Sequence, residues 1–270
     1  MNTVTLDKVT SRDGTPITYY RSGAGSPLIL VSGAGAANPV AWTAVVPALD
    51  GHFSVYAVDR RGHGESGDGL PYAIEREFED IAAVVDAVGE PVNLLGHSFG
   101  GLCALGAALL TGNIRKLVLY EPLSIPFPGK PVYPEGFIEQ LQALIDAGDR
   151  ERALTVFYRV IAGLSPLEIE QVKSSPVWPA RLAIAHTLPR EMRADERYRF
   201  DAQRFKDLHT PTLLLGGGDS RDFEKKGNEL VAAALPNSRV AVMPGQGHIA
   251  MYTAPDLFLY EVLSFLIGPR

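Results

Sequence analysis

Short apolar runs alternate with longer stretches in which apolar residues recur every three or four positions along most of the chain. The short runs are typical of strands covered on both faces, and the longer spacing is typical of helices with one buried stripe. Their repeated alternation predicts an α/β fold whose parallel strands are joined by right-handed crossovers. The predicted strands are Pro27–Val31, Phe53–Val58, Val92–Leu95, Ile114–Tyr120, Thr212–Leu215 and Arg239–Met243. The predicted helices are Val40–Leu49, Ile74–Val88, Gly100–Leu110, Asp222–Ala234 and Pro255–Ile267.

The start of the chain follows a different pattern. Two strand-like segments, Thr3–Val9 and Pro16–Tyr20, flank an Asp13-Gly14 turn. Aspartate followed by glycine is a common turn between paired strands, so these segments predict an antiparallel hairpin.

Between Pro122 and about Phe205 the strand pattern disappears. A proline-rich exit is followed by helical patterns only, and strand patterns then resume. An all-helical segment between two strands of one sheet is an insertion rather than a separate terminal domain. We therefore expect a core of residues 1–121 and 206–270 and an inserted helical cap of residues 122–205. The expected cap helices are Gly136–Ala147, Arg150–Ala162, Pro166–Lys173 and Pro176–Leu188.

Length, composition and charge narrow the class of protein. The chain has 270 residues, of which 46% are hydrophobic and 21% charged, which fits one globular α/β domain carrying an insertion. Its net charge of −6 argues against nucleic acid and anionic membranes as partners, because phosphate binding relies on clustered lysines and arginines. There is no apolar stretch of about 18 residues and no signal-peptide pattern at the start, so we expect no membrane partner. One cysteine, Cys103, forms no intramolecular disulfide and fits the cytoplasmic location that we expect.

The clearest chemical motif is Gly96-His97-Ser98-Phe99-Gly100, between a predicted strand and a predicted helix. A sharp strand-to-helix turn crowds the backbone, and glycines two residues either side of Ser98 remove the side chains that would clash. The turn exposes the serine hydroxyl at the carboxyl end of the strand. Unpaired N–H groups of the helix N-terminus lie behind the hydroxyl. This context favours Ser98 as a nucleophile.

This motif and the order of the elements resemble the α/β-hydrolase fold family, over nearly the whole chain. The resemblance implies a mostly parallel eight-stranded sheet with helices on both faces. It also implies a cap inserted between strands six and seven, and the chemistry of a serine esterase or a non-haem haloperoxidase. The catalytic order of the family is nucleophile, acid, histidine. Ser98 matches the nucleophile, and His248, in Gly245-Gln246-Gly247-His248, matches the histidine of the family's G-x-G-H segment.

The acid of the family follows strand seven, and Asp219 matches it after Gly216-Gly217-Gly218. Two competitors stay open. Asp222 fits better as the N-cap of the next helix. Glu121 ends the predicted strand Ile114–Tyr120, where some family members keep their acid, and we expect it to support the loop or the environment of the histidine.

A tetrahedral oxyanion needs two preorganised N–H donors. The amide of Phe99, directly after the nucleophile, is one candidate, and the amide of Ala34 best matches the second family position. The family usually has His-Gly where this chain has Ser32-Gly33, but an amide donor survives that change. His97 is expected to pack under the turn. The loop Asp59–Ser66, with its family-like D-x-R-G-x-G-x-S pattern, is expected to be structural.

The function that we expect is a cofactor-independent serine hydrolase with a small-molecule substrate. Few charged residues are expected near the catalytic loops, which favours a small, neutral, moderately hydrophobic ester or lactone. No metal or nucleotide motif is present in the sequence. A perhydrolase or haloperoxidase, a lyase or cyclase acting on a polyketide-like compound, and a ligand receptor remain alternatives, and the oligomeric state stays open. The expected apolar pocket residues are Trp42, Tyr133, Phe137, Phe157, Trp178 and Met251.

Overall fold

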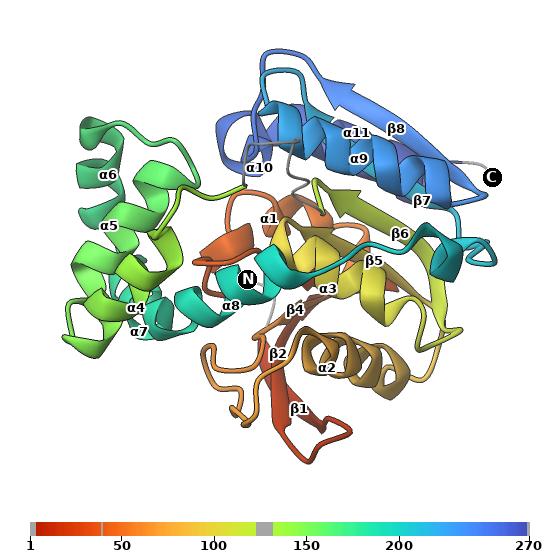
Figure 1. Cartoon of the computed structure of the whole chain (residues 1–270). Coiled ribbons are helices and arrows are strands. Elements are labelled where there is room, and N and C mark those ends of the chain that lie inside the picture. Colours follow the sequence, from red (N-terminus) through yellow and green to blue (C-terminus); the bar gives the residue numbers. More distant parts are fainter. Residues whose placement is uncertain (1–3, 39, 123–131, 269–270) are drawn as a thin grey trace.

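A twisted sheet of eight strands runs through the core of the molecule (Figure 1). The computed structural model describes residues 4–38, 40–122 and 132–268, without the side chains of Val40 and Glu168. The strand order is β1-β2-β4-β3-β5-β6-β7-β8, and all pairs from β4 to β8 are parallel. The strands are β1 (Thr5–Thr10), β2 (Pro16–Gly23), β3 (Ser26–Val31), β4 (Phe53–Val58), β5 (Val92–His97), β6 (Ile114–Tyr120), β7 (Thr212–Gly217) and β8 (Ser238–Met243). The mostly parallel eight-stranded sheet is as predicted, and β1 and β2 form the expected antiparallel hairpin.

Helices cover both faces of this sheet, as predicted. Alternate residues of a strand point to opposite faces, so Ile29 and Val31 join one hydrophobic cluster while Leu28 and Leu30 join the other. The first cluster lies beneath α2 (Ile74–Ala87), α3 (Phe99–Ala107) and α9 (Asp222–Ala234). The second lies beneath η1 (Val40–Trp42), α1 (Val46–Leu49), α10 (Ala250–Thr253) and α11 (Pro255–Ile267). The segment predicted as one helix, Val40–Leu49, is therefore two short pieces.

Five of the described α-helices lie between β6 and β7 and form the body beside the sheet in Figure 1. Their apolar faces bury one another in a third hydrophobic cluster. We refer to these helices as the cap. Its predicted limits, 122 and 205, stay a prediction, and residues 123–131 lie outside the described part of the chain. The helices are α4 (Phe137–Asp146), α5 (Arg150–Val160), α6 (Pro166–Lys173), α7 (Trp178–Ile184) and α8 (Leu188–Arg197), with η2 (Ala185–Thr187) before α8, and η3 (Ala202–Phe205) follows α8.

The last part of the cap differs from the sequence prediction. One helix, Pro176–Leu188, was expected there, but the structure has α7, η2 and α8. Pro189 lies in the first turn of α8, where a proline fits without losing a hydrogen bond, and it marks the start of a new helix. Most positions of α8 are charged or polar. Its few apolar residues do not form a recognisable helical pattern in the sequence.

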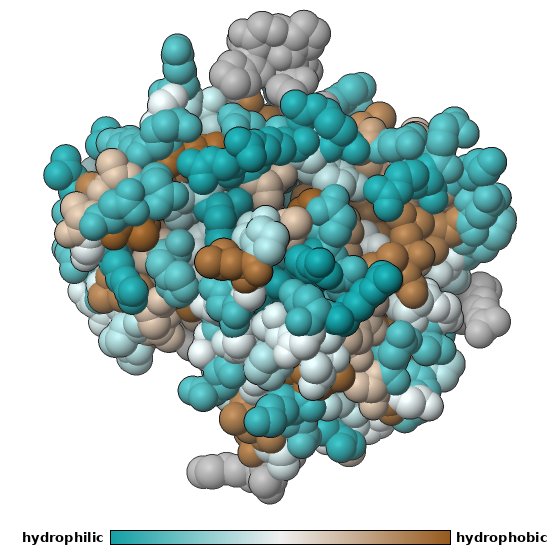
Figure 2. Space-filling model, turned by 60° about the horizontal axis from the view of Figure 1, so that its bottom comes forward, coloured by the Kyte–Doolittle hydropathy of each residue, from teal (hydrophilic) through white to brown (hydrophobic). Residues whose placement is uncertain are grey.

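One face of the molecule is largely polar (Figure 2). On the face drawn in Figure 2, hydrophobic side chains lie in small groups among hydrophilic ones. Within residues 4–38, 40–122 and 132–268, no helix combines the length and the apolar character needed to cross a bilayer.

Candidate active site

Ser98 occupies a strained turn between β5 and α3. Its backbone angles, φ 53° and ψ −127°, lie in a region that residues other than glycine rarely adopt. A Cβ at Gly96 would lie 2.5 Å from the carbonyl oxygen of Gly100, and one at Gly100 would lie 2.4 Å from the carbonyl oxygen of Ser32. Both positions therefore require glycine, for the reason that the sequence motif suggested. The turn places Ser98 on the wall of an enclosed pocket.

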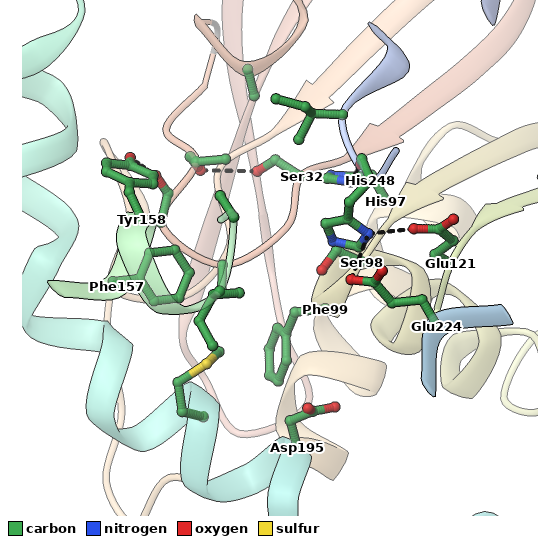
Figure 3. Close-up of a pocket in the computed structure, with 18 of the residues that line it drawn as sticks. Ser32, His97, Ser98, Phe99, Glu121, Phe157, Tyr158, Asp195, Glu224 and His248 are labelled. Carbon is green, nitrogen blue, oxygen red and sulfur yellow. Dashed lines mark hydrogen bonds and ion pairs between the residues drawn. The ribbon is translucent and has the colours of Figure 1, made fainter. Parts of the chain in front are cut away.

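His248 lies beside Ser98 at one end of this pocket (Figure 3). Its Nδ1 is 2.5 Å from Oε2 of Glu121, a carboxylate on a residue only 2% exposed. This contact fixes the ring and turns Nε2 away from Glu121. Within the described residues no hydrogen bond joins Ser98 to Nε2, a common state of unliganded hydrolytic sites.

Asp219, the predicted partner of the histidine, is exposed and does not line the pocket. Its backbone N–H donates to the carbonyl of Gln246, which fixes the loop after β7. Glu121 takes the place next to His248 that the sequence analysis assigned to Asp219. The structure therefore corrects that assignment of the carboxylate partner.

Strand register explains why Glu121 lies here. In the β5–β6 pair His97 is opposite Tyr120, and the next residues along the two strands are Ser98 and Glu121. The amide of Ser98 donates to the carbonyl of Tyr120 at 2.8 Å, which holds the two strand ends together. Glu121 also has a positive φ, 47°, so both residues leave their strands through strained backbone. Adjacent strand ends thus present the hydroxyl and the carboxylate at the same edge of the sheet.

The environment of Glu121 keeps it ionised. Burial alone would raise the pKa of this carboxyl group, but the hydrogen bond and the charge of His248, with the N–H of Gly217 at 2.8 Å, bring the pKa below its ordinary value. A carboxylate in this state holds the Nδ1 proton of His248 and would stabilise the imidazolium when the ring gains a second proton.

The loop that carries His248 is held from below by two aromatic residues. Nε2 of His97 lies 2.8 Å from the carbonyl oxygen of His248 and, because a carbonyl only accepts, must carry the proton. Burial lowers the pKa of His97 well below its usual value, so this ring is neutral. The hydroxyl of Tyr120 donates to the carbonyl of Gly247 and accepts from the amide of Ala250 at 3.0 Å. His97 thus packs under the turn, as expected, and supports the histidine loop.

A second carboxylate near the ring was not anticipated. Oε1 of Glu224, on α9, lies 3.5 Å from Nδ1 of His248 and 2.5 Å from Nη2 of Arg221. The side chain is 2% exposed. Glu224 also closes the first turn of α9 by accepting from the backbone N–H of Arg221 at 2.9 Å. A glutamate at the third position of a helix is typical of a helix cap. The sequence therefore explains Glu224 by its capping role and gives no sign that it also lies beside His248.

Glu121, Glu224 and His248 are the kinds of residue that bind metals, with one potential ligand atom from each within 4.8 Å of the others. Each carboxylate already has donors: Gly217 and His248 for Glu121, and Arg221 for Glu224. The guanidinium of Arg221 would also repel a cation at this point. The arrangement fits a histidine held by carboxylates better than a metal site.

The two predicted oxyanion donors are close to the serine. Ala34 and Phe99 both line the pocket. A Cβ at Gly33 would lie 3.0 Å from the Cβ of Ser98, so the loop after β3 passes directly against the turn of Ser98. In the described part of the chain neither amide, of Ala34 or Phe99, has a hydrogen-bond acceptor. Both N–H groups are therefore available to a ligand.

The pocket itself, about 100 Å³, is only partly as expected. Trp42, Tyr133, Phe157 and Met251 line it, but the predicted Phe137 and Trp178 lie in the hydrophobic cluster of the cap instead. The side chains of Phe137 and Trp178 pack between cap helices. The pattern of apolar residues along the sequence does not distinguish such a position from one in a pocket wall. The expectation that few charged residues lie nearby is wrong: the lining includes Arg181, Asp195, Arg221 and Glu224.

Comparison with known proteins agrees with this geometry. The sequence model described as the alpha/beta hydrolase family matches residues 28–261. The chain belongs to this family. A solved alpha/beta hydrolase from Sphaerobacter thermophilus is 35% identical, with a TM-score of 0.82 over 96% of this chain and 99% of that one. An esterase from Rhodococcus sp. is 26% identical, with a TM-score of 0.76 over 97% and 98% of the two chains. N-formylmaleamate deformylase from Pseudomonas putida is 28% identical over 100% of this chain and 99% of its own.

This α/β-hydrolase is an enzyme of the hydrolase class, as the sequence predicted. Its family-like loop Asp59–Ser66 is structural, as expected, and buried ion pairs hold it in place. Arg60, fully buried, bonds Glu77 at 2.9 Å and Glu191 of α8 at 3.0 Å, and its Nε donates to the carbonyl of Ser32 at 3.1 Å. His63 contacts Glu191 at 2.8 Å. The loop thereby joins the cap to the segment that carries Ala34.

Proposed function

We propose that this α/β-hydrolase is a serine hydrolase that cleaves a small acyl compound through an acyl-enzyme. The observation that carries the proposal is the convergence of Ser98, His248 and Glu121 at one end of an enclosed pocket (Figure 3). The Rhodococcus relative is an esterase and the Pseudomonas putida relative a deformylase, which supports a carboxylesterase-like reaction on an ester or a related acyl bond. A cytoplasmic location, based on composition, is part of the proposal.

In the proposed reaction the Oγ of Ser98 attacks the acyl carbon while Nε2 of His248 takes the hydroxyl proton. Glu121 stays ionised beside Nδ1 and stabilises the imidazolium. The amides of Ala34 and Phe99 donate to the oxyanion. His248 then protonates the leaving group, and the bond between the acyl carbon and that group breaks. A water molecule, deprotonated by His248, attacks the acyl carbon of the Ser98 ester and forms a second tetrahedral intermediate. As the bond between that carbon and Oγ breaks, His248 returns the proton to Oγ, which releases the acid and regenerates the hydroxyl.

The direct test is labelling of the protein with a fluorophosphonate, followed by mass spectrometry of the modified peptide. The proposal predicts one modified residue, Ser98, and loss of p-nitrophenyl acetate hydrolysis in Ser98→Ala while the circular dichroism spectrum is unchanged. Labelling elsewhere, or full activity in Ser98→Ala, would remove Ser98 as nucleophile.

Other measurements separate the alternative functions. A lyase or cyclase that uses His248 only as a base gives no acyl adduct on Ser98 during turnover. A perhydrolase shows peroxide-dependent halogenation of a dye in acetate buffer, because peroxide replaces water at the acyl-enzyme. A receptor would be labelled but would release the acyl group in a single slow turnover.

A further inference from the structure

Arg181 of α7 lies in the wall of the pocket and is held by tyrosines. Its Nη1 donates to the hydroxyl of Tyr158 at 2.6 Å, and the side chain also bonds the hydroxyl of Tyr252. Its guanidinium carbon lies 5.3 Å from the centre of the Tyr158 ring. Figure 3 shows Tyr158 across the pocket from Ser98 and His248. The guanidinium bonded to Tyr158 is thus fixed on the side of the pocket away from the nucleophile.

No carboxylate neutralises Arg181 among the described side chains. Other buried or pocket-lining arginines of this protein have carboxylate partners. Arg61, fully buried, bonds Asp80 at 2.7 Å, and Arg221, also in the pocket wall, pairs with Glu224 at 2.5 Å. The partners of Arg181 are phenols, and desolvation of their hydroxyls raises the pKa of Tyr158 and of Tyr252, so both stay neutral.

The hydrogen bonding of Arg181 is also incomplete. A guanidinium offers five N–H donors, and the Nε of Arg181 is buried without a partner in the part of the chain that the structure describes. A partly buried charge without a counter-ion is costly unless a ligand supplies the opposite charge. The nearby acid Asp195 does not serve, because the hydroxyl of Tyr133 donates to it and Figure 3 shows it well away from Tyr158.

From this unbalanced charge we propose that Arg181 binds a carboxylate of the substrate, at the end of the pocket opposite Ser98. The inference rests on the proposed function and names its substrate class: a short acyl compound with a free carboxylate, such as the half-ester or half-amide of a small dicarboxylic acid. A guanidinium matches a carboxylate through paired N–H donors. The small cavity of about 100 Å³ favours a short spacer between the two ends.

One further contact links this recognition to the reacting end. The hydroxyl of Tyr158 accepts from Arg181 and donates to the carbonyl of Gly35 at 2.8 Å. Gly35 follows Ala34, whose amide is one of the oxyanion donors in the proposed reaction. A Cβ on Gly35 would lie 2.7 Å from the ring of Phe157, so the cap packs directly against this loop. A carboxylate on Arg181 would therefore be held by the same chain of bonds that positions the oxyanion loop.

The test compares protection of Ser98 from a neutral fluorophosphonate by two compounds, monomethyl succinate and methyl butyrate. They differ by a carboxylate in place of a terminal methyl group. We expect monomethyl succinate to protect at a concentration about 10- to 100-fold lower than methyl butyrate, as a charge-assisted, paired contact would give. Arg181→Gln should remove this preference and Arg181→Lys should keep part of it. Arg159→Gln, which removes an exposed cap arginine, should keep all of it.

The outcomes are distinct. Equal protection by the two compounds in the wild-type protein, or an undiminished preference in Arg181→Gln, overturns the role of Arg181 and leaves the serine hydrolase intact. Absence of Ser98 labelling in the wild-type protein overturns the proposed function itself. A circular dichroism spectrum of Arg181→Gln that matches the wild type shows that the variant is folded, so a lost preference reports on carboxylate binding.

Discussion

Strands β6 and β7 end side by side, and an acidic residue follows each of them. The two acidic residues differ in burial and in their contacts. Glu121, directly after β6, is buried and holds His248, whereas Asp219, two residues beyond β7, is exposed. The loop after β7 carries the family-like sequence, but the loop after β6 has the register with the serine strand. The comparison teaches that the acid of such a site is selected by strand register and burial, and a matching local motif is not sufficient.

The largest expected effect comes from Glu121→Gln. The amide keeps the size of the side chain but removes its charge and can donate to Nδ1, which favours the wrong tautomer of His248. By analogy with other serine hydrolases, kcat should fall about 1,000- to 10,000-fold. Steady-state kinetics on p-nitrophenyl acetate measure the change, and a fall below tenfold would show that Glu121 is not the partner of the histidine.

Tyr120→Phe should have the next largest effect. The change removes a hydroxyl that bonds the carbonyl of Gly247 and the amide of Ala250, on either side of His248. Leaving these buried groups unpaired costs about 1–3 kcal/mol, part of it in unfolding free energy. We expect about a tenfold loss of kcat and a lower melting temperature, read by steady-state kinetics and thermal denaturation. Unchanged kcat would mean that the loop carrying His248 keeps its position without the hydroxyl of Tyr120.

Glu224→Gln should act more weakly, because Glu224 lies 3.5 Å from Nδ1 and shares its charge with Arg221. We expect kcat to fall by about threefold to tenfold, the scale of a partly neutralised charge near the ring. In a Glu121→Gln background the same change should cost more, because Glu224 is then the remaining carboxylate beside His248. Equal costs in the two backgrounds, from a double-mutant cycle, would show that the two glutamates act independently.

Asp219→Asn should have the smallest effect. The side chain is exposed, and the backbone contact to Gln246 does not depend on its charge. We expect kcat/KM within about twofold of the wild type, since exposed substitutions outside packed features change little. A loss comparable with that of Glu121→Gln would reverse the comparison and restore the assignment made from sequence.

Local motifs were enough to predict much of this molecule. The individual strands and helices, the turn at Ser98 and the loop of His248 depend on neighbours in sequence, so the sequence indicates them directly. The choice between Glu121 and Asp219 depends on the pairing of β6 with β5, the strand that leads to Ser98. Their paired residues lie 23 positions apart in the chain, as Leu94 and Leu117 do, and no local pattern contains this register. The same holds for Phe137 and Trp178, since apolar residues look alike whether they face a cap core or a cavity.

The pocket charges show the same limit. Arg181 lies in a segment whose sequence suggests an ordinary cap helix. Its proposed role comes from its surroundings in space, because no described side chain supplies a carboxylate partner. Glu224 looks like a helix-capping residue and is one, yet tertiary packing also brings it to His248. Sequence patterns indicate the role of a residue within its own helix or strand, whereas the site depends on tertiary contacts between several elements.

The most direct test of the central claim is proton NMR of the hydrogen bond on Nδ1 of His248. The wild-type protein and Asp219→Asn should both show a far-downfield imidazole N–H resonance, which disappears in Glu121→Gln and in His248→Ala. Persistence of that resonance in Glu121→Gln together with its loss in Asp219→Asn would contradict the assignment of Glu121 as the carboxylate that holds His248.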